Sequence, residues 1–78
     1  SVMVSYGRIL SVDNEPAFRQ EVNSYLEDSG FTTFEASSNQ EGLELFREKN
    51  PDLVLSSLQM VGENGLELLD AIRRESPE

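Results

Sequence analysis

Apolar residues along this chain alternate between short branched runs and runs with helical spacing. The segment "RILSV" (8–12) is rich in branched side chains and ends at a polar cluster that contains Pro16, which predicts a strand followed by the first turn of a helix. Gly30 suits the position just past a helix end, so we expect this helix over about 15–29. Its apolar face is marked by Phe18, Val22, Tyr25 and Leu26.

A second strand and helix follow directly. The segment "FTTFEA" (31–36) is β-branched and aromatic, which favours a strand. Ser38 with Glu41 three residues later has the pattern of a capping box, in which each residue satisfies a free backbone N–H at a helix start. The pattern predicts a helix from Ser38 to near Asn50, because Pro51 cannot continue it.

The third strand is predicted at "DLVLS" (52–56). Its three consecutive apolar residues are typical of a parallel strand that is covered on both faces; they are Leu53, Val54 and Leu55. A loop from Ser57 to Asn64 follows, and Asn64 with Glu67 repeats the capping pattern. We expect a third helix ending near Glu75, with one face marked by Leu66, Leu69 and Ile72.

The order βαβαβα with short connections predicts an α/β fold. Such alternation favours a three-layer parallel sheet with right-handed crossovers, whose ligand site lies beyond the carboxyl ends of the strands. The 78 residues suffice for one small domain with a marginal core. We expect the domain over 8–78, and an N-terminal arm or expression remnant over 1–7.

Charge and composition narrow the chemistry. With 6 Lys+Arg against 15 Asp+Glu the net charge is −9, which argues against direct binding of nucleic acid or of an anionic membrane. The chain has no cysteine and no histidine, so disulfides, thiolate zinc sites and imidazole bases are excluded, and a bound metal would be a hard cation held by oxygen. The missing cysteine fits a cytoplasmic protein.

Two blocks of the sequence resemble the bacterial response-regulator receiver (CheY-like) domain. They are "ILSVDNEPAFR" and "PDLVLSSLQMVGENGLELLDAIR", which are similar to the first three βα units of that flavodoxin-like fold. The resemblance implies the strand order 2-1-3 and a site for phosphoryl transfer with Mg²⁺. It places Asp13 and Asn14 on the acidic pair after strand 1, Ser57 on the phosphoacceptor aspartate, and Gln59 on the backbone carbonyl that completes the metal ligands.

This sequence departs from the family at the residues that would do the chemistry. Asn14 and Ser57 replace the two carboxylates that would bind the cation directly. A neutral amide and a hydroxyl bind Mg²⁺ more weakly than two carboxylates, because Mg²⁺ favours carboxylate oxygen. We therefore expect a degenerate receiver without enzymatic activity or cofactor, with at most weak Mg²⁺ binding at Asp13, Asn14 and Gln59, that acts by protein contacts.

Other interpretations stay open from the sequence. Asp13, or a carboxylate in a register shifted by one residue, could accept phosphate, although Arg19 six residues after Asp13 fits the first register better. Asn14 could simply cap the first helix. Ser57 is expected to be an inert hydroxyl, since the sequence offers no histidine and a single lysine, Lys49, to activate it. A fragment without autonomous function is the remaining alternative.

The predicted strand order also has a consequence for partners. In the order 2-1-3 the third strand is an edge, although Leu53, Val54 and Leu55 are patterned for the interior of a sheet. An apolar edge favours pairing with another strand. We expect a homodimer through this edge, or a protein partner that donates a strand.

Overall fold

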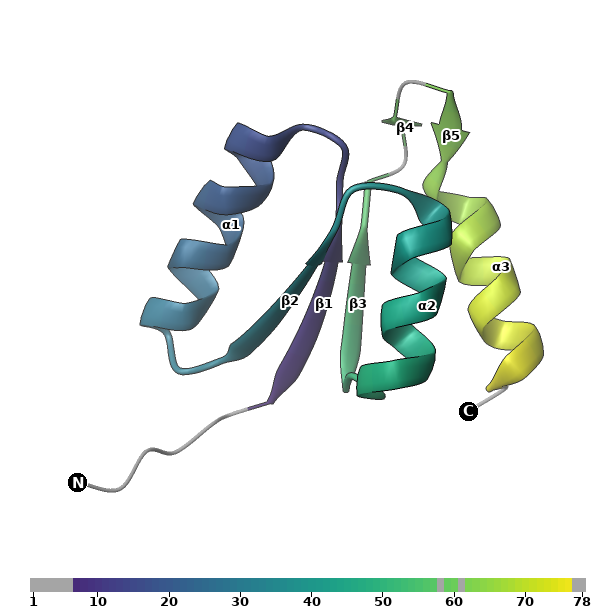
Figure 1. The fold of residues 1–78 in the computed structure, drawn as a ribbon. Coiled ribbons are helices and arrows are strands. Elements are labelled where there is room, and N and C mark those ends of the chain that lie inside the picture. The colour runs from purple at the N-terminus through teal and green to yellow at the C-terminus, as the bar shows by residue number, and fades with distance from the viewer. Residues whose placement is uncertain (1–6, 58, 61, 77–78) are drawn as a thin grey trace.

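The computed structural model describes residues 7–57, 59–60 and 62–76 (Figure 1). Of the predicted arm, only Gly7 lies among them, and its carbonyl accepts a 2.9 Å hydrogen bond from the Thr32 N–H. The helices and strands are β1 Arg8–Val12, α1 Pro16–Asp28, β2 Thr32–Ala36, α2 Asn39–Lys49, β3 Leu53–Ser56, β4 Gln59–Met60, β5 Glu63–Asn64 and α3 Gly65–Glu75.

β1 lies at the centre of a parallel sheet with the order β2-β1-β3, as the sequence predicts. In its register Leu10 is opposite Phe34 on one side and Val54 on the other. All three strands run the same way, so their carboxyl ends meet at one end of the sheet, where the helices begin (Figure 1). The fold is the α/β flavodoxin-like arrangement that the resemblance implies.

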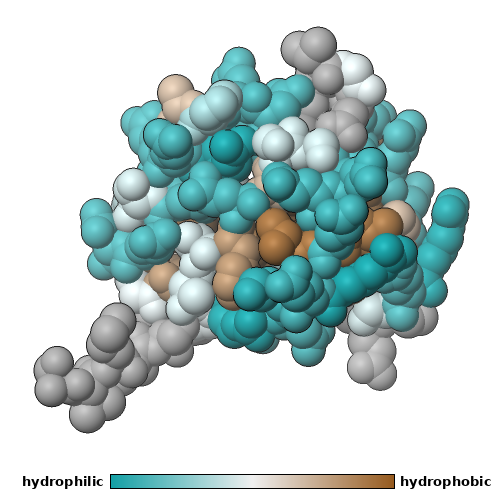
Figure 2. Space-filling view, in the orientation of Figure 1, coloured by the Kyte–Doolittle hydropathy of each residue, from teal (hydrophilic) through white to brown (hydrophobic). Residues whose placement is uncertain are grey.

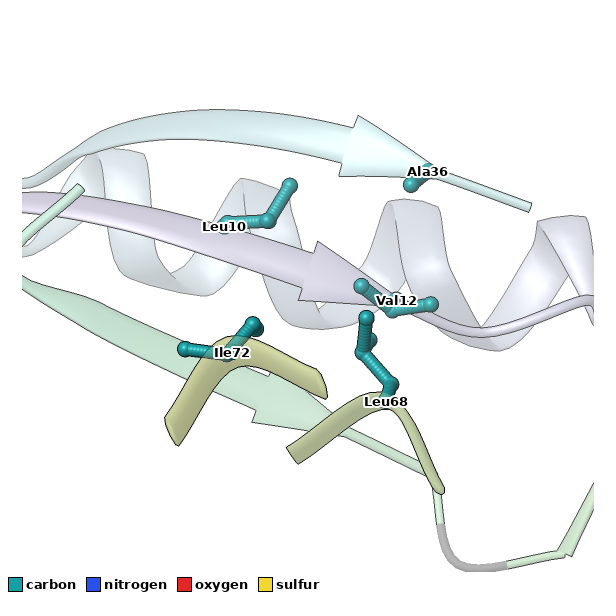
Figure 3. Packing of buried hydrophobic residues seen from close by; sticks show 5 residues of the cluster. All are labelled: Leu10, Val12, Ala36, Leu68 and Ile72. Carbon is teal, nitrogen blue, oxygen red and sulfur yellow. The ribbon is translucent and has the colours of Figure 1, made fainter. Parts of the chain in front are cut away.

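The helices cover the two faces of this sheet unequally. α2 and α3 pack against each other on one face, whereas α1 lies alone on the other (Figure 1). The core sits between the sheet and the α2–α3 pair, where side chains from β1, β2 and α3 converge (Figure 3). Its buried members are Leu10, Val12, Ala36, Leu68 and Ile72.

Two glycines allow α2 and α3 to lie close to the sheet. A Cβ atom on Gly42 would lie 2.9 Å from a methyl group of Val12, so α2 packs directly on β1. A Cβ atom on Gly65 would lie 2.0 Å from the Ser57 carbonyl oxygen, so the first residue of α3 touches the chain that leaves β3. Alanine fits neither place without movement.

The buried face of α1 differs from the one that the apolar spacing marks. Phe18 and Tyr25 are 54% and 72% exposed, and the fully buried residue of the helix is Asn23. Among the described residues, both polar atoms of the Asn23 amide lack a hydrogen-bond partner. The prediction of an inner face with Phe18 and Tyr25 is therefore wrong: α1 packs on β2 and β1, and the side of the helix that it buries carries Asn23.

α3 also turns a different face inward. The structure buries Leu68 and Ile72, while Leu66 is 55% exposed. Leu68 packs with Val12, which a face defined by Leu66, Leu69 and Ile72 does not predict. The helix start itself is as predicted, because the Asn64 side chain accepts a 2.8 Å hydrogen bond from the Leu66 N–H.

β3 is covered on one face only, which corrects the expectation of cover on both. Val54 packs on the core, whereas Leu53 and Leu55 are 50% and 39% exposed. The segment expected as a loop after Ser57 also contains a short antiparallel pair, β4 with β5, in which Gln59 is opposite Asn64.

One face of the molecule is largely hydrophilic. Figure 2 shows polar residues over most of the visible face and hydrophobic residues in a band across its middle. Within the described residues, no helix has the length and apolar character needed to cross a membrane.

Candidate functional site

Asp13 and Ser57 meet at the carboxyl ends of β1 and β3. The Ser57 N–H donates a 3.0 Å hydrogen bond to the Val12 carbonyl, and the Asp13 N–H donates one of the same length to the Ala36 carbonyl. Both residues line a hollow of about 310 Å³ between α1 and β3. The full lining is Ser11, Val12, Asp13, Phe18, Arg19, Val22, Leu55, Ser56 and Ser57.

The Asp13 carboxylate is engaged in holding the start of α1. Its Oδ1 atom accepts a 3.0 Å hydrogen bond from the Glu15 N–H. Glu15 is the N-cap residue and makes no side-chain cap of its own, so the N-cap position falls one residue after Asn14. Asn14 is half-buried beside Asp13, in the position that the resemblance gives it.

Arg19 ties three segments together next to this site. Its Nη1 atom donates to the Asp13 backbone carbonyl, and its Nε atom donates a 3.0 Å hydrogen bond to the Glu35 carboxylate on β2. The Arg19 side chain is only 14% exposed. The spacing from Asp13 to Arg19 fits the receiver motif. It did not predict that the Arg19 side chain connects α1 with β2 and with the loop after β1.

The two serines at the end of β3 lie against α3. The Ser56 hydroxyl donates a long, 3.4 Å hydrogen bond to the Gly65 carbonyl, and both Ser56 and Ser57 are half-buried. Gln59 follows in β4, and the structure describes its backbone pairing but not its side chain. The hydroxyl of Ser57 thus stands at the strand end where the resemblance implies a carboxylate.

The donors at this site are mostly neutral. Across residues 7–57, 59–60 and 62–76, no group of three or more His, Cys, Asp or Glu side chains is arranged to hold a metal ion. Asp13 contributes one carboxylate, and Asn14 and Ser57 contribute an amide and a hydroxyl. This donor set does not suit Mg²⁺, which binds through carboxylates and keeps a near-octahedral oxygen shell.

Away from the site, one ion pair links α2 to α3. The Arg47 guanidinium donates from Nε and Nη2 to the Glu75 carboxylate. This hydrogen bonding lowers the pKa of Glu75 and raises the pKa of Arg47. Both groups are at the surface, so the pair fixes the relative position of the two helices more than it adds stability.

The parallel order 2-1-3 and the polar residues at the carboxyl ends of β1 and β3 define an α/β module of the receiver class. A family profile described as "Response regulator receiver domain" matches residues 9–78. The chain therefore belongs to the response regulator receiver family.

Three known proteins illustrate the similarity. The nitrate/nitrite response regulator protein NarL of Escherichia coli (strain K12) is 40% identical over 70 residues, which cover 87% of this chain. Sporulation initiation phosphotransferase F of Bacillus subtilis (strain 168) is 30% identical over 66 residues, or 85% of this chain. The crystal structure of a LuxR-family two-component response regulator from Aurantimonas sp. SI85-9A1 superposes with a TM-score of 0.86 at 32% identity and covers 94% of this chain.

The chain spans only part of these proteins. It covers 32% of NarL, 53% of the sporulation protein and 54% of the Aurantimonas structure. What is shared is thus a set of βα units of a receiver domain.

Proposed function

We propose that this receiver module acts through protein contacts and does not transfer a phosphoryl group. The observation that carries the proposal is the hydroxyl of Ser57 directly after β3, with the amide of Asn14 in the loop that follows β1. Phosphoryl transfer to a receiver needs a carboxylate nucleophile and a cation that offsets the charge on the phosphoryl oxygens. Asn14 and Ser57 carry no negative charge, so neither can act as the carboxylate nucleophile or bind the cation as an anionic ligand. The module is therefore not an enzyme.

The state of Asp13 supports the same proposal. Its carboxylate already accepts the Glu15 N–H at the start of α1, so binding a cation would compete with that hydrogen bond. Mg²⁺ therefore binds very weakly, and no cofactor is needed. The proposed location is the cytoplasm. The chain has no cysteine and so needs no disulfide, and disulfides are rare in that reducing compartment.

Titration with Mg²⁺, followed by amide NMR shifts, tests the silent site. The wild-type chain should show no common transition at residues 13, 14 and 57 below about 1 mM Mg²⁺. The double variant Asn14→Asp with Ser57→Asp restores two anions and should bind measurably. A shared sub-millimolar midpoint in the wild type would contradict the proposal, and the single variant Asn14→Asp shows how much one carboxylate contributes.

We further propose that the free edge of β3 is where this chain pairs with a second copy. β3 has β1 as its one neighbour in the described sheet, and its side chains are Leu53, Val54, Leu55 and Ser56. Two such edges meeting across a two-fold axis would form a continuous six-stranded sheet with the β3 strands antiparallel at its centre. A strand from another protein would use the same edge.

Ser56→Pro tests this pairing and keeps the ladder to β1. The Ser57 N–H donates to the Val12 carbonyl at 3.0 Å, so in an alternating strand the N–H groups of Leu53 and Leu55 also point to β1, and that of Ser56 points away from it. Proline at position 56 therefore removes an edge donor. Sedimentation at about 100 μM should show a dimer for the wild type and for the control Ser56→Ala, and a monomer for Ser56→Pro; a monomeric wild type would refute the pairing.

A further inference from the structure

α1 contacts the sheet without taking part in the hydrophobic core. The buried cluster is formed by β1, β2 and α3, and the half-buried apolar side chains that pack against it come from α2, β2 and β3. Within the described residues, no side chain of α1 belongs to this cluster. The helix lies on the other face of the sheet, against β2 and β1 (Figure 1). Its attachment therefore depends on contacts of its own.

Two side-chain hydrogen bonds join α1 to β2, and both lie at the surface. The Arg19 Nε atom donates a 3.0 Å hydrogen bond to the Glu35 carboxylate, and the Thr33 hydroxyl donates one of 2.6 Å to the Glu27 carboxylate. Water competes with hydrogen bonds at exposed positions, and dissolved salt screens an exposed ion pair. Each of these bonds therefore orients the helix more than it holds it to the sheet.

The fully buried residue of α1 adds a cost to this attachment. Asn23 lies four residues after Arg19 and so on the same side of the helix, the side that faces β2. It is 3% exposed, and among the described residues neither its Nδ2 nor its Oδ1 atom has a hydrogen-bond partner. Burial of such an amide lowers the equilibrium constant for attachment of the helix at least about fivefold. Water satisfies the amide once α1 moves away from the sheet.

The start of α1 is also joined to the strand-end site through Asp13. The Asp13 carboxylate accepts the Glu15 N–H at 3.0 Å, and the Asp13 backbone carbonyl accepts a hydrogen bond from Arg19 Nη1. A ligand that takes the carboxylate loses the competition with Glu15 while the helix is attached, and gains the carboxylate when the helix moves away. Detachment of α1 and occupancy of Asp13 therefore favour each other, because coupling between two equilibria is reciprocal.

We propose that α1 detaches as a unit from a sheet that stays folded, and that this opening frees the Asp13 carboxylate. β1, α2 and α3 keep the core in the open state, because α1 takes no part in it. The buried amide of Asn23 raises the population of that state. The opening involves contacts of α1 with β2 and with the loop after β1. The inference therefore goes beyond the proposed function and holds whether or not the chain pairs through β3 or takes up phosphate.

Amide hydrogen exchange followed by NMR, under conditions in which the opening equilibrium sets the rate, tests the proposal on the intact chain. The N–H groups of residues 20–28 should exchange at least about tenfold faster than those inside β1 and α3. Ile72→Val weakens the core and should speed exchange in β1 and α3 about two- to tenfold, while the rates in α1 stay unchanged. An equal acceleration in α1 would show that the helix opens only with the whole fold, and would overturn the proposal.

Asn23→Leu tests the cause of the opening. Leucine has a similar shape without the polar atoms, so exchange in α1 should slow at least about fivefold. The matched control is Ser24→Leu at the next, exposed position, which changes helix propensity by a similar amount and should alter the α1 rates by less than about twofold. Equal effects of the two substitutions, or faster exchange in a folded Asn23→Leu chain, would refute the role of the buried amide. The Ile72→Val comparison stands if Asn23→Leu does not fold.

Asp13→Ala tests the link between the helix and the strand-end site. It removes the acceptor of the Glu15 N–H and should speed exchange in α1 about threefold or more. Asp52→Ala is the matched control, because the Asp52 carboxylate accepts the Arg8 N–H at 2.9 Å, at the opposite end of β1. Its loss should leave the α1 rates unchanged. Unchanged α1 rates in Asp13→Ala, or equal effects of the two variants on α1, would contradict the proposed link.

Discussion

The close contact between α3 and the end of β3 makes Gly65→Ala a sharp test of the packing. A methyl group at this position would lie 2.0 Å from the Ser57 carbonyl oxygen, at least 1.0 Å inside the 3.0 Å below which Cβ contacts are essentially never found. The Ser57 backbone cannot easily yield, because its N–H is bonded to the Val12 carbonyl on the central strand. The start of α3 must therefore move away from the sheet.

The cost follows from what α3 carries into the core. Leu68 and Ile72 are 2% and 8% exposed, and both lose contact if the helix shifts. Overpacking of this kind typically costs about 1–3 kcal/mol, and alanine regains less than about 1 kcal/mol of helix propensity at a first-turn position. We expect a net loss of about 2 kcal/mol, a large share of the ~4–12 kcal/mol expected for a domain of this size.

Urea denaturation followed by far-UV circular dichroism measures this loss, with Gly62→Ala as the matched control. Gly62 has a φ of +80°, and a Cβ atom there would meet nothing within 4 Å. Its replacement should cost only the backbone strain of about 1 kcal/mol. The packing argument is refuted if Gly65→Ala unfolds at the same urea concentration as the wild type or at a higher one than Gly62→Ala.

Two further predictions concern stability. Asn23→Leu should stabilise the chain by about 1–3 kcal/mol in the same urea assay, because it removes two buried polar atoms that lack partners, and a lower midpoint would show that the amide is satisfied in solution. Glu75→Gln should lower stability slightly at neutral pH. Because the folded pKa of Glu75 lies below its usual value, the contribution of its pair with Arg47 is present above the usual carboxyl pKa and is lost as the pH falls through the lowered one. Wild type and variant should therefore converge in acid, and a gap that widens in acid would contradict the pairing.

The sequence predicts the order of elements because each one carries a local signal. Branched runs, Pro16 and the serine and asparagine caps mark the starts and ends, and the observed bounds of the three predicted strands and three predicted helices differ from the predicted ones by at most one residue. The parallel order of strands followed from this alternation and from the receiver motifs. β4 and β5 were missed, since strands of two residues are too short to show an alternating pattern.

The faces of the helices were harder to predict, because burial depends on which strands a helix crosses. Phe18 and Tyr25 have the spacing of a core face, yet α1 crosses β2 and β1 and leaves them exposed. Asn23 is polar and gave no sign of burial. For the site, the resemblance identified Asp13 and Ser57 at neighbouring strand ends, but the hydrogen bond from the Glu15 N–H to Asp13 and the bridging role of Arg19 depend on the folded loop.

The central claim is that the strand-end site no longer takes up a phosphoryl group. The most direct measurement is intact mass spectrometry, with amide NMR, of the chain incubated with acetyl phosphate and Mg²⁺, and in parallel with beryllofluoride and Mg²⁺. We predict no added phosphoryl group and no saturable shifts at residues 13, 14 and 57. A stoichiometric phosphoryl adduct, or saturable beryllofluoride binding with shifts that centre on the ends of β1 and β3, would contradict the account.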